Sequence, residues 1–251
     1  MEDRGSIRRK KGNLFVIATP IGNLEDLTFR ALRVLREVSA IACEDTRRTL
    51  KLLTRYGVQK RLISYFQPRE GQRIPQILAF LDEGKDIALV SDSGTPAVSD
   101  PGYRLIREAV KAGIRIIPVP GPSAAIAALS ASGLPTHRFL FLGFPPPKNE
   151  KTRRFLLSLQ DEEATLIFYL PTRRMADFIA LARETLGDRE AVIARELTKV
   201  HEELLRGPLS RILQGVEAKT LKGEATVLIQ GRQRLKPHSA GTEKLPEPPE
   251  T

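Results

Sequence analysis

Short apolar runs and amphipathic stretches alternate along the first half of this chain. An apolar run such as 86–90 is typical of a buried parallel strand, whereas 103–111 places apolar residues at helical spacing. The pattern predicts strands at 14–19, 39–43, 61–65, 86–90 and 114–118, with helices at 28–37, 46–55, 70–82 and 101–111. Strands and helices that alternate at these spacings favour a parallel sheet covered on both faces.

The second half of the chain follows a proline-rich break at 118–122. The pattern there predicts helices at 123–132, 149–158, 173–185 and 208–214, with strands at 138–143, 164–170, 190–195, 202–206 and 224–230. The close spacing of the last strands favours some antiparallel pairing, and therefore a mixed sheet. We expect an α/β fold of two α/β domains, with a ligand cleft between them.

Domain boundaries follow from these patterns. We expect a basic arm at 1–12, a mainly parallel domain at 13–119, a mixed-sheet domain at 120–231 and a tail at 232–251. The tail is rich in Pro, Glu, Gly and Ser and has no apolar face to bury, so its composition predicts disorder.

Three loops rich in Gly, Pro and Ser each follow a predicted strand, at 20–28, 91–102 and 120–123. Ligands of open α/β sheets bind at the carboxyl ends of the strands, so three such loops at one edge predict a pocket. For 91–102 an alternative is a capped turn, with Asp100 as the helix N-cap and Pro101 at the first helical position.

Charge and composition limit the classes of partner, metal site and location that we expect for this chain. The chain has 251 residues, a formal net charge of +10 and a pI near 9.9, which favour an acidic partner such as RNA over a generally basic enzyme. One cysteine, Cys43, excludes a disulfide within the chain, and three histidines without ligand spacing predict no metal site. Pro20 and Gly22 interrupt the first apolar run, so we expect no signal peptide. Pro118, Pro120 and Pro122 cut the apolar run 114–134, so we expect no membrane span and a cytoplasmic location.

Five motifs together carry a family resemblance. They are Val16–Ala31, Glu44–Arg47, Ser91–Gly102, Pro118–Ala124 and Ala194–Lys199. In this order they resemble the bacterial 16S rRNA 2'-O-ribose cytidine methyltransferases, a family of the tetrapyrrole methylase-like superfamily, over roughly residues 13–231. The resemblance implies an enzyme that takes a methyl group from S-adenosylmethionine. It also implies a donor site between the two domains, ribosomal RNA or the small ribosomal subunit as substrate, and a homodimer.

The resemblance also implies donor-binding positions in both domains. They are Ile21, Gly22, Ser93, Gly94, Thr95, Val98, Ser123, Ala124, Leu170 and Leu197. The first loop differs from the acidic loop of related tetrapyrrole methylases, because Asn23 occupies the acidic position. As a group these loops are specific, although each loop alone is a weak signal.

Methyl transfer to a ribose hydroxyl needs a positioned acceptor, and a general base helps because the hydroxyl is a poor nucleophile. We expect Asn23, Glu44 and Asp100 to orient the acceptor, with Glu44 as the best candidate base. The alternative for Glu44 and its neighbour Asp45 is an N-cap of the helix that begins at Thr46.

Four cations adjoin these motifs and are candidates to hold RNA phosphates. They are Arg47, Arg48, Arg195 and Lys199. The alternative is an ordinary solvated helix face, which suits Arg48 better than Arg195.

The sequence departs from the ribosomal RNA enzymes at Phe66–Glu70, at Pro171–Arg173 and in the Pro/Glu tail. Two alternatives therefore remain. One is a tetrapyrrole C-methyltransferase that acts on a corrinoid or porphyrinoid, against which stand Asn23, the Glu44–Arg47 motif and the basic charge. The other is an RNA-binding ribosome-assembly protein with weak or no catalysis.

Overall fold

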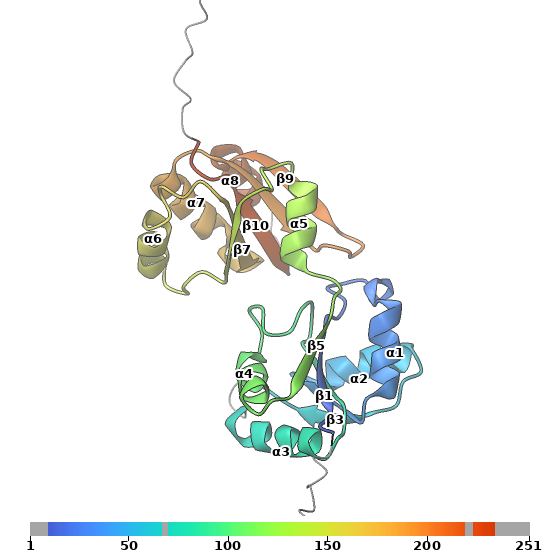
Figure 1. Ribbon diagram of the computed structural model, residues 1–251. Coiled ribbons are helices and arrows are strands. Elements are labelled where there is room, and N and C mark those ends of the chain that lie inside the picture. Colours follow the sequence, from blue (N-terminus) through green and yellow to red (C-terminus); the bar gives the residue numbers. More distant parts are fainter. Residues whose placement is uncertain (1–9, 67–69, 219–222, 234–251) are drawn as a thin grey trace, which may run out of the picture.

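Two lobes, each built on a five-stranded sheet, make up the described part of the chain (Figure 1). The computed structural model describes residues 10–66, 70–218 and 223–233. Most of the expected basic arm, nearly all of the expected tail and positions 67–69 of the divergent turn lie outside the described residues.

The first lobe is a parallel sheet in the order β3-β2-β4-β1-β5. Its strands are β1 (Asn13–Ile17), β2 (Ala40–Cys43), β3 (Arg61–Ser64), β4 (Ile87–Val90) and β5 (Arg115–Val119). Its helices are α1 (Phe29–Glu37), α2 (Thr46–Arg55), α3 (Glu70–Asp82) and α4 (Tyr103–Lys111), with a short 3-10 turn η1 (Leu24–Asp26). The parallel arrangement agrees with the alternation of strands and helices in the sequence.

Both faces of this sheet are covered by helices, which explains why its inner strands β2 and β4 are apolar throughout. Successive side chains point to opposite faces, so Ile41 and Cys43 pack toward α1 and α2. Ala40 and Ala42 pack toward α3 and α4. Burial raises the pKa of the Cys43 thiol to about 11, as expected of an inert, buried cysteine.

The second lobe is a mixed sheet in the order β6-β7-β10-β8-β9. Its strands are β6 (Phe139–Gly143), β7 (Thr165–Pro171), β8 (Glu190–Arg195), β9 (Glu203–Pro208) and β10 (Glu224–Ile229). Its helices are α5 (Ala124–Ser132), α6 (Asn149–Leu157), α7 (Met175–Leu186) and α8 (Leu209–Glu217), with a 3-10 turn η3 (Thr172–Arg174). Only β6 and β7 are parallel among these pairs, so the expected mixed sheet is confirmed.

Helices cover the two faces of the second sheet unequally. Helix α5 packs alone on one face, whereas α6, α7 and α8 build the larger core on the other (Figure 1). The chain reaches α5 directly from β5 through 120–123, so this segment connects the two lobes.

The bounds of the elements agree with the sequence pattern to within three residues, with one informative difference. The helix expected at 101–111 begins at Tyr103, its N-cap is Gly102 at a φ of +139°, and no side chain caps it. The interpretation of Asp100 as an N-cap is therefore wrong, and its carboxylate is free for another role. None of the described helices is long and apolar enough to cross a bilayer.

Candidate active site between the lobes

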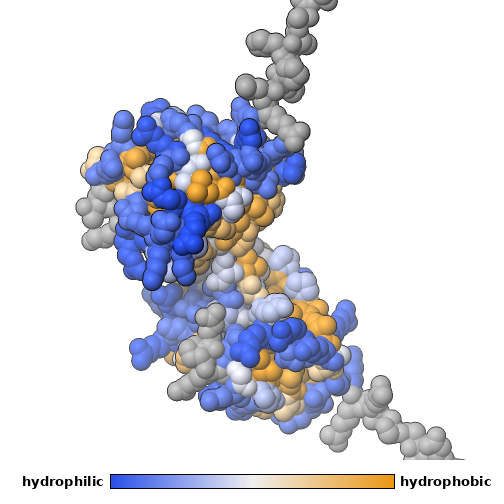
Figure 2. Space-filling model, turned by 90° about the vertical axis from the view of Figure 1, so that its left-hand side faces the viewer, coloured by the Kyte–Doolittle hydropathy of each residue, from blue (hydrophilic) through white to orange (hydrophobic). Residues whose placement is uncertain are grey.

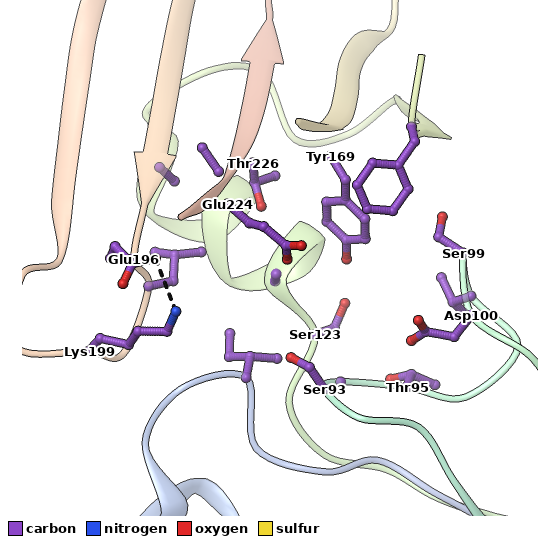
Figure 3. A pocket seen from close by; sticks show the side chains of 18 residues that line it. Ser93, Thr95, Ser99, Asp100, Ser123, Tyr169, Glu196, Lys199, Glu224 and Thr226 are labelled. Carbon is purple, nitrogen blue, oxygen red and sulfur yellow. Dashed lines mark hydrogen bonds and ion pairs between the residues drawn. The ribbon is translucent and has the colours of Figure 1, made fainter. Parts of the chain in front are cut away.

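A pocket lies between the lobes, where the carboxyl ends of the first-lobe strands face the second sheet (Figure 3). The first lobe and the connecting segment contribute Ile21, Ser93, Gly94, Thr95, Val98, Ser99, Asp100, Ser123 and Ala124. The second lobe contributes Phe144, Tyr169, Ala194, Glu196, Leu197, Lys199, Glu224, Ala225 and Thr226. The three loops that the sequence singled out therefore meet at one site.

Direct hydrogen bonds hold these three loops together. The backbones of Thr19 and Gly94 exchange two hydrogen bonds, at 2.9 and 3.0 Å. The Thr95 hydroxyl donates to the carbonyl of Pro122 at 3.4 Å. Gly94 has a φ of +79°, a conformation that residues with a Cβ rarely adopt, so the loop requires glycine at this position.

Backbone strain is concentrated at the pocket. Among the described residues, four that are not glycine have a positive φ: Ala97, Ser99, Glu196 and Thr198. Each such conformation costs on the order of 1–3 kcal/mol and persists only where its surroundings enforce it. All four lie in the two loops, one from each lobe, that border the pocket, which is typical of a functional site.

These two lobes contact each other through closely packed loops. The backbone N–H of Asn23 donates to the Thr198 hydroxyl at 3.0 Å. A Cβ on Gly22 would lie 2.6 Å from a side-chain carbon of Lys199, and a Cβ on Gly143 would lie 2.7 Å from the Ser99 hydroxyl. Glycine at these positions lets the backbone of one lobe approach the other.

Asp100 is the carboxylate that lines the pocket from the first lobe, whereas Glu196 and Glu224 line it from the second. The pKa of Asp100 is raised to about 6, first by burial and then by the negative charges of Glu44, Asp92 and Glu224, while a hydrogen bond from Ser91 opposes the rise. A carboxylate with a pKa near 6 is ionised at neutral pH yet basic enough to accept a proton.

Glu44 is absent from the residues that line the pocket. Burial raises its pKa, and the charge of Asp92 adds to that effect. Its neighbour Asp45 caps α2 by accepting a hydrogen bond from the N–H of Arg47 at 2.8 Å. The capping alternative therefore holds for Asp45, whereas Glu44 acts on the pocket through its charge on Asp100.

An aromatic wall closes the pocket on the second lobe. The ring of Tyr169 packs against Phe141 and Phe144, with centroids 5.0 and 5.6 Å apart. Its hydroxyl oxygen accepts a hydrogen bond from the N–H of Ala125 at 3.3 Å and points toward Ser123 and Asp100 (Figure 3). Burial raises the pKa of this phenol.

Of the residues expected to bind the donor, eight line the pocket: Ile21, Ser93, Gly94, Thr95, Val98, Ser123, Ala124 and Leu197. Leu170 does not, because its side chain is fully buried in the core on the α6–α8 face of the sheet. Its neighbour Tyr169 points to the opposite face and reaches the pocket, as strand alternation requires. The sequence analysis missed Tyr169, although it is the neighbour of Leu170, which the family resemblance implied as a donor contact.

Gly22 and Arg48 line a second hollow, a groove of about 540 Å³ that adjoins the pocket. Groove and pocket share Ile21, Ser93, Lys199 and Glu224, so they are continuous. The pocket itself holds about 140 Å³, and with the groove it reaches the ~300–1,000 Å³ typical of ligand sites. Together the two hollows have room for a ligand as large as a nucleoside.

Three of the four candidate phosphate-binding cations lie at or near this groove. Arg48 forms an ion pair with Asp92 at 3.4 Å, Lys199 pairs with Glu196 at 3.0 Å, and Arg47 is exposed on α2. Lys51, one helical turn after Arg47, also lines the groove and was missed. The fourth cation, Arg195, is bonded to Glu203 at 3.0 Å, a partly buried pair within the sheet.

Asn23 lies outside the pocket lining. Its carboxamide oxygen accepts a hydrogen bond from the N–H of Glu25 at 3.1 Å, so its side chain caps the turn η1. Within the described part of the chain, no three His, Cys, Asp or Glu side chains are grouped so that they can hold a metal ion.

Comparisons with known proteins agree with this architecture. The family model of the tetrapyrrole (corrin/porphyrin) methylases matches residues 13–213. The chain is 45% identical over 239 residues to ribosomal RNA small subunit methyltransferase I of Halalkalibacterium halodurans, an alignment that covers 95% of this chain and 83% of that protein. It is also 45% identical over 222 residues to the protein of this name from Thermotoga maritima, with 88% and 100% covered.

Solved structures show the same fold at lower identity. Cobalt precorrin-4 methyltransferase superposes with a TM-score of 0.65 at 17% identity, covering 92% of this chain and 98% of that one. Uroporphyrin-III C-methyltransferase from Thermus thermophilus, solved in complex with S-adenyl homocysteine, superposes at 0.61 and 18% identity, covering 87% and 97%.

Proposed function

Since this chain belongs to the tetrapyrrole methylase family, and within it to the ribosomal RNA small subunit methyltransferase I branch, we infer that it transfers a methyl group to small-subunit ribosomal RNA. The observation that supports this inference best is the sequence identity of 42–48%, over at least 86% of the chain, to several proteins of that name. The resemblance recognised in the sequence motifs is thereby confirmed. Tetrapyrrole methyltransferases of solved structure are 17–22% identical to this chain, a likeness that shows the fold alone.

We propose S-adenosylmethionine as the methyl donor and the pocket between the lobes as its site. When bound, it supplies an activated methyl group on a positively charged sulfur. The pocket fits such a molecule: backbone amides and hydroxyls at Ser93–Thr95 and Ser123 suit its polar groups, and the Tyr169 wall suits its apolar surface. The carboxylates of Asp100 and Glu224 complement its positive charges.

The proposed acceptor is the 2'-hydroxyl of a cytidine ribose. In the reaction the new O–C bond forms as the S–C bond breaks, and the hydroxyl proton must leave. We propose that Asp100, instead of Glu44, accepts this proton, because Asp100 lines the pocket and Glu44 does not. Glu44 keeps a supporting role, since its charge raises the pKa of Asp100.

The groove beside the pocket is proposed to receive the acceptor nucleotide. Arg48, Lys51 and Lys199 line it and offer positive charge to phosphates. Arg47, exposed on the same helix as Arg48, adds to this field. Arg195 is satisfied by Glu203, so we assign it to the stability of the second sheet.

A homodimer also belongs to this proposal. Phe29 and Val200 are 95% and 96% exposed, and burial against a second copy would remove these side chains from water. Sedimentation of the purified chain tests it: a monomer at micromolar concentration contradicts the dimer.

Methyl transfer from labelled donor to small ribosomal subunits that lack the modification tests the function. After digestion of the RNA to nucleosides, we expect the label on 2'-O-methylcytidine. Label on a base, or on a tetrapyrrole supplied in competition, contradicts the proposed acceptor. Tight binding of subunits without any transfer supports the ribosome-assembly alternative instead.

A further inference from the structure

Positive charge is unevenly distributed over the second lobe. Residues 123–233 contain sixteen Lys and Arg against thirteen Asp and Glu. Two short segments, 148–154 and 172–174, hold six of these cations and one of the acids. The rest of the lobe is therefore net negative, and the positive charge is local to these two segments.

Most of these cations are exposed and available. Lys148, Lys151 and Arg173 are exposed and form no ion pair with the residues that the structure describes. Arg154 is exposed as well, and its contact with Glu150 is long, at 3.7 Å. We call Lys148, Lys151, Arg154 and Arg173 the basic ridge. Figure 2 shows the side of the second lobe that carries α6 and α7, which is largely hydrophilic around a small apolar patch.

The two segments of the ridge are fastened to each other. The Arg174 guanidinium donates to the carbonyl of Pro146 at 2.7 Å and to the hydroxyl of Thr152 at 3.2 Å. That hydroxyl donates to the same carbonyl at 2.7 Å. Turn η3 is therefore bound to the start of α6, which places Arg173 beside the cations of that helix.

Both segments begin at the aromatic wall of the pocket. Phe144 lines the pocket four residues before Lys148, and Tyr169 lines it four residues before Arg173. Phe144 is 51% exposed, so part of its ring faces solvent at the pocket rim. The ridge thus leads away from the reaction site along the second lobe, with an exposed ring at its start.

We propose that the basic ridge and Phe144 bind a single-stranded segment of the RNA substrate beside the acceptor nucleotide. Exposed cations along a surface fit the phosphates of a nucleic-acid backbone, and an exposed ring stacks on an unpaired base. The inference rests on the proposed function. It adds a second contact surface, on the opposite lobe from Arg47, Arg48 and Lys51.

Paired charge removals test the ridge in the full-length protein. Lys151→Ala with Arg173→Ala removes two charges from the ridge. Arg183→Ala with Arg211→Ala removes two exposed charges from α7 and α8 of the same lobe, and is the matched control. Affinity for small ribosomal subunits and for a short single-stranded RNA is measured over a series of salt concentrations.

We expect the ridge pair to lower the slope of log affinity against log salt by about 1.4, because each phosphate contact on a single strand contributes about 0.7. The control pair leaves the slope at the wild-type value. Donor affinity, measured by calorimetry, stays unchanged in both pairs. Equal slopes for the ridge pair and the control pair overturn the proposal.

Phe144 is tested separately, because stacking carries no charge. Phe144→Ala should weaken the single-stranded RNA about 5- to 100-fold at an unchanged salt slope, and Phe144→Tyr should restore affinity. Double-stranded RNA of the same sequence should not distinguish these variants. Loss of affinity for both RNAs alike, or dissociation of a dimer in the ridge pair, assigns this surface to another partner and overturns the proposal.

The outcome separates the ridge from the proposed function. Wild-type protein that methylates subunits, with ridge variants that behave like their control, rejects the ridge alone. Wild-type protein that neither binds nor methylates ribosomal RNA rejects the function itself.

Discussion

The two lobes contribute to one pocket in different ways. In the first lobe every sheet strand runs in the same direction, so the loops after β1 and β4 and the segment after β5 all emerge at one edge. In the second lobe β10 runs against its neighbours β7 and β8. Its first residue, Glu224, pairs with Pro171 at the end of β7, and Ala225 pairs with Arg195 at the end of β8.

Strand direction therefore decides where site residues are found in each lobe. In a parallel sheet, only the loop after a strand reaches the ligand edge. In a mixed sheet, the start of an antiparallel strand reaches the same edge, so Glu224 and Thr226 line the pocket although they open β10. The two lobes therefore have different roles at the pocket: the first lobe contributes the proposed base, and the second contributes the aromatic wall and the rim of the pocket.

The sharpest test of this division is Asp100→Asn in the first lobe. Removal of the proposed base should lower single-turnover methyl transfer about 10²–10⁴-fold with donor affinity retained. In the wild type the rate should rise with pH through about 6 and then level, because the ionised carboxylate is the active form. A rate within a few-fold of wild type would show that Asp100 is not the base.

The loop of the first lobe is tested by Gly94→Val. A β-branched side chain at a φ of +79° is strained, so the loop must move and donor affinity should fall about 10- to 100-fold. Gly113→Val is the control, since its φ is +67° and open space surrounds it, away from the pocket. Calorimetry with the donor distinguishes them, and equal affinities would remove the loop from the site.

The wall of the second lobe is tested by Tyr169→Leu. Loss of the ring and its contacts with Phe141 and Phe144 should weaken donor binding about tenfold, while turnover at saturating donor stays near wild type. Tyr169→Phe keeps the ring and should keep most of the affinity. A fall in saturated turnover comparable to that of Asp100→Asn would show that the second lobe also carries chemistry.

The contacts of the two lobes with RNA are compared by removing one cation from each lobe. Arg47→Ala and Lys199→Ala should each lower the salt slope by about one, because each removes one phosphate contact. Binding to small subunits across a salt series measures this. If Arg47→Ala lowers the slope and Lys199→Ala does not, then Lys199 stays paired with Glu196 and does not bind a phosphate.

Glu44→Gln should change the enzyme least of all these variants. It removes a negative charge that raises the pKa of Asp100, so the acidic limb of the rate profile should move toward lower pH. The plateau rate should stay within several-fold of wild type. A plateau lowered a hundredfold would return the role of base to Glu44.

Much of this architecture could be predicted from the chain. Alternating apolar runs and amphipathic stretches predicted each sheet strand and α-helix of the two lobes to within three residues, because burial on one or both faces leaves a regular period in the sequence. The Gly/Pro/Ser loops predicted most of the first-lobe lining of the pocket, because such residues are needed where backbone conformation is unusual.

Other assignments depended on side-chain direction and on partners distant in sequence. Asp100 was equally plausible as a helix cap until the observed start of α4 at Tyr103 removed that role. Asn23 and Arg195 looked available in the sequence, yet one caps η1 and the other pairs with Glu203.

Local patterns and ordered motifs were enough to establish the family, the two α/β lobes and the loops that form one side of the pocket. Three features needed the folded chain: that Asp100 and not Glu44 lines the pocket, that Tyr169 and not Leu170 points into it, and that Glu224 enters from an antiparallel strand. The physical reason is that strand direction and sheet order are set by packing between distant segments, and a side chain's environment depends on them.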